Sequence, residues 1–186
     1  AGTTTIDGLS DAVSGITNFT NSLILGHQTT GTLRSADGNT AVGYAAMDAI
    51  TSGDNNVAVG FTSLSANTTG ATNVAVGKDA LLLNTTGGNN VAVGANSLDA
   101  NTTGDENTAL GDGALGANTT ADKNVAVGAR AMFVNTTGAS NVAVGYEALE
   151  VNTTASNNTA VGYLALTANT TGTNNNALGA NSLDAN

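Results

Sequence analysis

Apolar and polar positions follow a pattern along this chain that repeats every 17 residues. Each unit opens with Asn-Val-Ala-Val-Gly or a close variant, and no insertion or deletion interrupts the spacing. A fixed period in this range indicates an array of stacked structural units. We number the positions of a unit from 1 to 17, starting at the opening asparagine. These asparagines are Asn39, Asn56, Asn73, Asn90, Asn107, Asn124, Asn141, Asn158 and Asn175.

Two apolar segments in each unit predict two short β-strands. The first has β-branched valines at the alternate positions 2 and 4, bounded by asparagine and glycine, which is typical of a strand. The second lies near positions 8 to 11, as in residues 148–151. A unit of 17 residues is too short for a helical hairpin, and the units show no 3.6-residue period. The sequence therefore predicts an all-β fold, a parallel β-solenoid (β-roll) with one unit per turn and a rise of about 4.8 Å per turn.

Stacking in register would place identical positions of successive units on top of one another. Asparagine occupies position 1 of every unit, and position 12 of every unit except at Ile50, so we expect two hydrogen-bonded asparagine ladders. Leu98 and Leu115 at position 9 should face the interior, whereas Asn96 and Gly113 at position 7 should lie outside. Aspartate at position 9 should therefore be far more damaging than a change at position 7.

The opening strand predicts association between chains. Its valines at positions 2 and 4 point one way, and the alanine at position 3 points the other way with the glycine at position 5. A strand with one solvated face should alternate apolar and polar residues, but this one is apolar or small on both faces. One face should fill the coil and the other should meet a second chain. If the small-residue face is the outer one, Ala92→Arg or Ala126→Arg should abolish assembly.

The chain before the first regular unit divides into two segments. Residues 22–38 form a degenerate unit, which predicts a capping coil, because terminal units of a stack lack one neighbour. In residues 1–21 the apolar residues have the 3-4-3 spacing of a coiled coil, which would make this segment a neck that joins chains. Its glycines and threonines equally suit an irregular segment lying on the first coils. Residues 39–186 form the regular solenoid. The spacing is that of Ile6, Leu9, Val13 and Ile16.

Charge and composition narrow the range of partners. The net charge is −10, with only Arg34, Lys78, Lys123 and Arg130 positive, so we expect no binding to nucleic acid or to an anionic membrane surface. No apolar run approaches the roughly 20 residues of a membrane-spanning helix. The chain has no cysteine, which excludes disulfides and thiolate metal sites.

Few residues are candidates for chemistry. The single histidine, His27, lies in the degenerate unit, and the carboxylates that recur at position 10 should form a solvated ridge rather than a cleft. Asp105, Glu106 and Asp122 could attract a cation weakly, but the calcium-binding Gly-Gly-x-Gly-x-Asp pattern is missing. We therefore expect no catalytic, cofactor or metal site. The position-10 carboxylates are Asp48, Asp99, Glu150 and Asp184.

Aromatic residues are the one feature that suggests recognition. Four of the six lie at position 6, which varies between units and should be exposed. Exposed aromatics commonly anchor binding partners, and a host glycan is one such partner. Alternatively, each ring covers the neighbouring coil or chain. These candidate receptor contacts are Tyr44, Phe61, Tyr146 and Tyr163.

The unit as a whole resembles known fibre repeats. Its opening Asn-(Val/Thr)-Ala-(Val/Leu)-Gly looks like the Asn-Ser-Val-Ala-Ile-Gly repeats in the heads of trimeric autotransporter adhesins, which are left-handed parallel β-rolls wound into trimers. A complete unit such as residues 158–172 is also similar to repeats in phage tail fibres and related virion appendages. The resemblance covers residues 22–186 and implies a left-handed, trimeric coil. Adhesin heads have shorter and more variable units, so the regular 17-residue unit favours a virion fibre.

Three functions from different classes follow. The first is a homotrimeric structural fibre, the shaft or head of a phage tail fibre or other virion appendage, which joins other fibre components and attaches to a host surface. The second is a bacterial surface adhesin. The third is an ice-binding solenoid, suggested by threonines at positions 13 and 14, but adjacent residues of a strand point to opposite sides. We expect no enzymatic activity from any of them.

Overall fold

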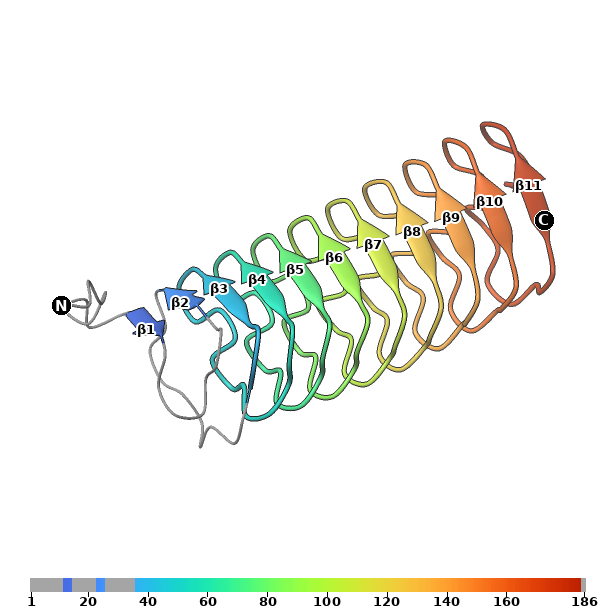
Figure 1. Cartoon of the computed structure of the whole chain (residues 1–186). Coiled ribbons are helices and arrows are strands. Elements are labelled where there is room, and N and C mark those ends of the chain that lie inside the picture. The colour runs from blue at the N-terminus through green and yellow to red at the C-terminus, as the bar shows by residue number, and fades with distance from the viewer. Residues whose placement is uncertain (1–11, 15–22, 26–35, 185–186) are drawn as a thin grey trace, which may run out of the picture.

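A computed structural model describes residues 12–14, 23–25 and 36–184. The chain winds into a coil, and one three-residue strand from each turn lies beside the next along one side (Figure 1). All the strands belong to one sheet, in sequence order. They are β1 (Ala12–Ser14), β2 (Leu23–Leu25), β3 (Thr40–Val42), β4 (Val57–Val59), β5 (Val74–Val76), β6 (Val91–Val93), β7 (Thr108–Leu110), β8 (Val125–Val127), β9 (Val142–Val144), β10 (Thr159–Val161) and β11 (Asn176–Leu178).

Strand pairing confirms the predicted parallel β-solenoid. From β3 to β11 each strand pairs in parallel with the next, and partners are 17 residues apart, as Ala92 and Ala109 are. β2 pairs with β3 at the same offset. β1 pairs antiparallel with β2, so the backbone at Val13 is extended and not helical as in a coiled coil. The other residues of the 3-4-3 pattern, Ile6, Leu9 and Ile16, lie outside the described residues, as does His27.

The second predicted strand is absent, and a bent segment takes its place. In every turn from β3 onward, the residues at positions 7 and 9 have left-handed φ angles, for example 53° at Asn96 and 50° at Leu98. This conformation costs roughly 1–2 kcal/mol for a residue other than glycine. Hydrogen bonds between turns hold it: the Leu98 amide donates to the Ala114 carbonyl at 3.0 Å, and the Asn96 amide donates to the Lys78 carbonyl at 2.9 Å. The apolar pattern indicated burial here but not backbone shape.

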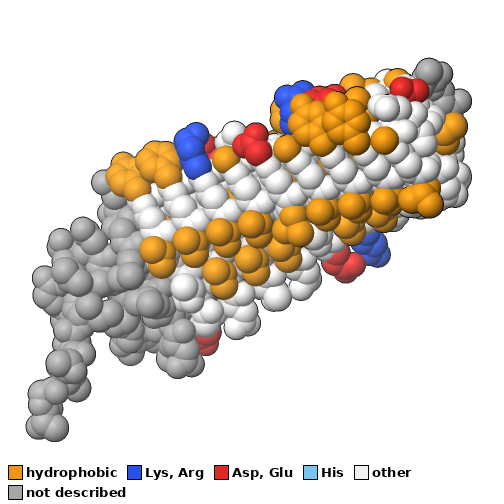
Figure 2. All heavy atoms as spheres, turned by 90° about the horizontal axis from the view of Figure 1, so that it is seen from above, with side chains coloured by type: hydrophobic (Ala, Val, Ile, Leu, Met, Phe, Trp, Pro, Cys, Tyr) orange, Lys and Arg blue, Asp and Glu red, His pale blue; other side chains and the backbone are white. Residues whose placement is uncertain are grey.

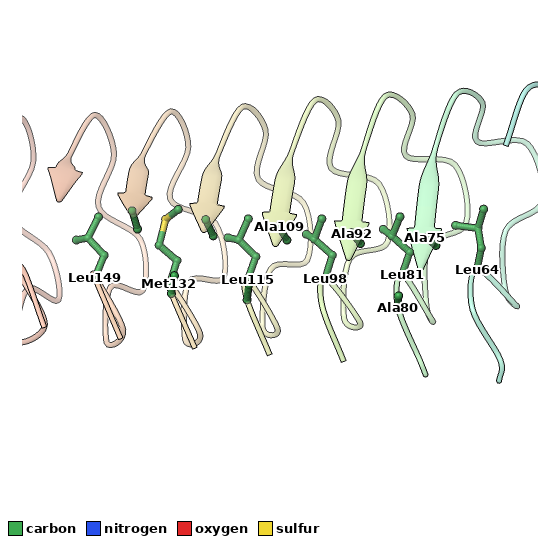
Figure 3. Packing of buried hydrophobic residues seen from close by; sticks show 14 of the residues in the cluster. Leu64, Ala75, Ala80, Leu81, Ala92, Leu98, Ala109, Leu115, Met132 and Leu149 are labelled. Atoms are coloured by element: carbon green, nitrogen blue, oxygen red, sulfur yellow. The ribbon is translucent and has the colours of Figure 1, made fainter. Parts of the chain in front are cut away.

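The interior is one side chain thick. Each turn contributes a leucine or methionine at position 9, and these side chains lie in a row beneath the strands (Figure 3). Alanine at position 3 and alanine or serine at position 8 leave room for them. Leu98 and Leu115 are fully buried, as predicted. Gly113 is also buried, so its predicted place outside is wrong; the Phe133 ring of the next turn packs against it.

Two buried asparagine ladders close one corner of the coil. In the turn that opens at Asn90, the side-chain amides of Asn90 and Asn101 both donate to the Gly104 carbonyl, at 2.8 and 3.0 Å. The Asn90 side-chain oxygen accepts the backbone amide of Asn107 in the next turn at 2.9 Å. These bonds recur along the array, which confirms the predicted ladders. Buried amide groups require hydrogen-bond partners, so the structure explains why asparagine occupies positions 1 and 12. At Ile50 an apolar side chain fills the same corner.

The two threonines of each turn have different surroundings. The position-13 hydroxyl donates to the position-13 carbonyl of the next turn, as from Thr85 to Thr102 at 3.0 Å. The neighbouring position-14 side chain, such as that of Thr86, is exposed. Position 13 therefore joins turns, and position 14 forms a single outward rank of hydroxyls.

Gly94→Ala at position 5 should destabilise the coil by about 3 kcal/mol, because it combines backbone strain with a steric clash. Gly94 has a φ of 134°, and a Cβ there would lie 2.4 Å from the Gly111 carbonyl oxygen. Gly88→Ala at position 16 is the matched control. A Cβ there would lie 3.1 Å from its nearest atom, the Ala71 carbonyl oxygen. The change should cost less than about 1 kcal/mol, because Ala71 and Ala139 occupy that position in other turns. Denaturant unfolding at one fixed protein concentration compares the two variants. If both variants lost the same free energy of unfolding, position 5 would have no specific requirement for glycine.

A candidate binding surface

The valine face of the sheet points outward. Val93 is 38% exposed and Leu110 is 36% exposed, whereas Ala92 between the valines of β6 is fully buried. Ala126 is buried in the same way. The expectation that the small-residue face could meet a partner is therefore wrong. The physical reason is the leucine row: a large side chain at position 9 needs a small residue opposite it inside so thin a coil.

Positions 2 and 4 together form an uncharged strip, which we call the outer stripe; position 4 is valine or leucine in every turn, and position 2 is valine, threonine or asparagine. A row of apolar side chains follows the whole length of the described coil on this face (Figure 2). Fully parallel sheets are almost always covered on both faces, and contiguous exposed apolar surface usually marks an interface. The outer stripe consists of Thr40, Val42, Val57, Val59, Val74, Val76, Val91, Val93, Thr108, Leu110, Val125, Val127, Val142, Val144, Thr159, Val161, Asn176 and Leu178.

Charged side chains are kept off the outer stripe. Within residues 36–184, every Asp, Glu, Lys and Arg lies at position 6, 7, 10, 16 or 17. Several acidic ones have a structural use: the Asp105 carboxylate accepts the Gly88 amide at 2.7 Å, and the Asp122 carboxylate accepts the Asp105 amide at 2.8 Å. In the described part of the chain, no group of three or more His, Cys, Asp or Glu residues could hold a metal ion.

The four candidate aromatics form two stacked pairs. The rings of Tyr44 and Phe61 lie 5.2 Å apart with an interplanar angle of 9°. The rings of Tyr146 and Tyr163 lie 5.6 Å apart at 13°. All four side chains are about half exposed. Each ring covers the ring of the adjacent turn, as the alternative interpretation held, and each pair also presents an open aromatic surface. The sequence placed all four on one rank but could not show the stacking.

Charged residues surround the second pair. The Arg130 guanidinium lies over the Phe133 ring, 4.5 Å from its centroid. Its Nε lies 3.0 Å from Oε1 of Glu150 and 3.3 Å from Oε1 of Glu147. The hydrogen bond to Glu150 raises the pKa of Arg130. A hydrogen bond from the Tyr146 hydroxyl to Glu147 raises the pKa of that tyrosine. Arginine, two glutamates and two tyrosines therefore lie together over three successive turns.

Sequence reasoning missed Arg130 and Phe133, although one signal for Phe133 was present. The preceding turn is the one regular unit with glycine at both positions 7 and 10, Gly113 and Gly116. A Cβ at either glycine would lie 3.1 to 3.2 Å from the nearest carbon of the Phe133 ring. The two glycines thus provide the space that Phe133 fills, and Phe133 in turn supports Arg130.

Comparisons with protein-family models, with curated proteins and with solved structures found no match to this chain. No helix among the described residues is long and apolar enough to cross a membrane. The fold and the surface chemistry therefore carry the functional argument.

Proposed function

We propose that this chain is a structural fibre segment, the shaft or head of a phage tail fibre or other virion appendage, that acts as a homotrimer in attachment. The observation that carries the proposal is the outer stripe, which has no charged residue in the nine turns from β3 to β11. A net charge of −10 keeps such chains apart unless the surfaces that meet are uncharged. The outer stripe meets that condition.

A second copy of this chain fits the outer stripe better than an unrelated globular partner. The side chains of the stripe repeat with the rise of the coil, about 4.8 Å per turn. Another copy has the same repeat by construction, so ridges on one chain can fit between ridges on the next along about 40 Å. A globular partner has no such period and would match only locally. Copies packed around an axis would cover the outward apolar side chain that every turn carries at position 4.

The number three comes from the resemblance to trimeric β-roll fibres. The chain has the mechanical character of a shaft, because each turn is bonded to the next by backbone, asparagine and threonine hydrogen bonds. Contacts are confined to neighbouring turns, so the structure can be lengthened without changing its cross-section. We propose no catalytic role.

A bacterial surface adhesin is the second candidate, because it would use the same opening motif and the same self-associating stripe. The regular unit length favours the virion. An ice-binding role is less well supported, since the position-13 hydroxyls are taken up by carbonyls and only one outward threonine rank remains.

Light scattering on the purified chain at micromolar concentration tests the assembly. The expected mass is three times the 18.1 kDa of one chain. A folded monomer would overturn the proposal, and a dimer would overturn the trimer. Antibodies against the chain then separate the two candidates: labelling of virion tails supports the appendage, and labelling of intact bacterial surfaces supports the adhesin.

A further inference from the structure

The rank of position-6 side chains is interrupted beside the second aromatic pair. Tyr146 and Tyr163 stack one turn apart with nearly parallel rings, so their outer faces look along the coil axis. Position 6 of the turn before Tyr146 is Ala129, and two turns before it is Asp112. The Arg130 amide donates to the Asp112 carbonyl at 2.9 Å, and the Glu147 amide donates to the Ala129 carbonyl at 3.1 Å. Asp112, Ala129 and Tyr146 therefore succeed one another along this edge.

At Ala129, the row of position-6 side chains that runs along the coil has no large side chain for one turn. The turns that carry Asp112 and Tyr146 are about 9.6 Å apart, twice the rise per turn. A six-membered ring lying over Ala129 would sit about one turn, or 4.8 Å, from Tyr146 and continue the stack. The rings of Tyr146 and Tyr163, also one turn apart, stack with their centroids separated by 5.6 Å. We call this position the Ala129 step.

Fixed polar groups border the Ala129 step. Arg130 follows Ala129 directly and is held between Glu147 and Glu150, with Phe133 beneath it. Asp112 is exposed on the opposite side. These side chains are already ordered by one another, so a ligand would not have to order them on binding.

We propose that the Ala129 step binds a neutral pyranose ring of a surface glycan. A pyranose has an apolar C–H face, which stacks on an aromatic ring, and an edge of hydroxyls that donate to carboxylates and accept from arginine. The charges of Arg130, Glu147, Glu150 and Asp112 sum to a negative value, and the whole chain is acidic, which disfavours sialylated or uronic sugars. This inference deepens the attachment role and rests on the proposed function.

At its Phe61 end, which lies among the described residues, the first aromatic pair differs from the second. Lys78 occupies the position-6 site next to Phe61, so that end of the stack adjoins a charged side chain. The nearby polar groups are engaged with each other: Lys78 pairs with Asp79, which also accepts the Thr62 hydroxyl. Tyr44 and Phe61 therefore provide a matched aromatic control on the same molecule.

The test uses lactose, cellobiose and chitobiose as neutral probes and sialyllactose as the anionic probe. Saturation-transfer NMR detects contact, and tyrosine fluorescence gives the affinity, because the chain has no tryptophan and three tyrosines. In a Tyr44→Phe background both remaining tyrosines belong to the second pair. We expect millimolar binding of at least one neutral disaccharide, and at least tenfold weaker binding of sialyllactose.

Variants locate the site. Ala129→Tyr should fill the step with a third ring and weaken sugar binding at least tenfold while the coil stays folded. Ala95→Tyr makes the same change two turns away and should leave binding unchanged, as should Phe61→Ala. Failure of all three neutral sugars to bind, or unchanged binding to Ala129→Tyr, would overturn the inference. The mass of the same samples separates the two proposals: a trimer that binds no sugar overturns the site alone, and a monomer that binds sugar overturns the fibre alone.

Discussion

Leu98→Asp is expected to prevent the solenoid from folding. Leu98 is fully buried in the leucine row, and no cationic side chain lies at the interior positions 3, 8 and 9 of the neighbouring turns. An unpaired buried carboxylate combined with lost apolar packing costs more than about 4 kcal/mol, a large part of the stability of a domain. The coil is one side chain thick, so the defect removes packing from both adjacent turns. Soluble yield, circular dichroism and resistance to proteolysis measure the loss.

Asn96→Asp is the control for this change. It introduces the same carboxylate two residues earlier, at an exposed side chain whose φ of 53° aspartate also tolerates. Its free energy of unfolding should change by less than about 0.5 kcal/mol. If the two variants lost stability equally, the assignment of position 9 to the interior would be incorrect.

The stacked fold could be predicted because the repeat alone determines which residues of successive turns lie beside each other. A period without insertions sets the register, and identical positions then stack whatever the path of the chain within a turn. Asn90 and Asn107 could be assigned to a ladder on this ground alone, and the hydrogen bond between them confirms it. The repeat does not determine the backbone conformation within a turn in this way. Leu98 adopts a left-handed φ that leucine does not signal, so the second segment was wrongly taken for a strand.

The orientation of the strand could not be read from residue size. Val-Ala-Val is compatible with either face inside, and the choice depends on what lies across the coil. Position 9 carries the large side chain, so alanine faces it and valine is left outside. The aromatic rank was predictable from variation at position 6. The residues beside it were not, because Arg130, Glu147 and Glu150 meet only when successive turns stack.

The double change of Val93 and Leu110 to Asp is expected to separate the assembled chains. Both side chains belong to the outer stripe, in neighbouring turns, and more than a third of each is exposed in the single chain. Aspartates at these partly exposed positions should cost an isolated coil less than they cost an assembly, where they would bring carboxylates from every copy together in an apolar contact. The mass in solution should fall from three times the chain mass to 18.1 kDa at micromolar concentration.

Thr86→Asp with Thr103→Asp is the matched control, since it adds the same two charges in successive turns at exposed position-14 side chains. That variant should keep the assembled mass. Should the stripe variant fail to fold because the monomer is unstable alone, Val93→Thr provides a milder test. It preserves side-chain shape but replaces one methyl group with a hydroxyl, so the assembly should form but dissociate at a higher protein concentration. An assembly that keeps its mass and its dissociation concentration in both stripe variants would show that the outward valines are not the contact between chains.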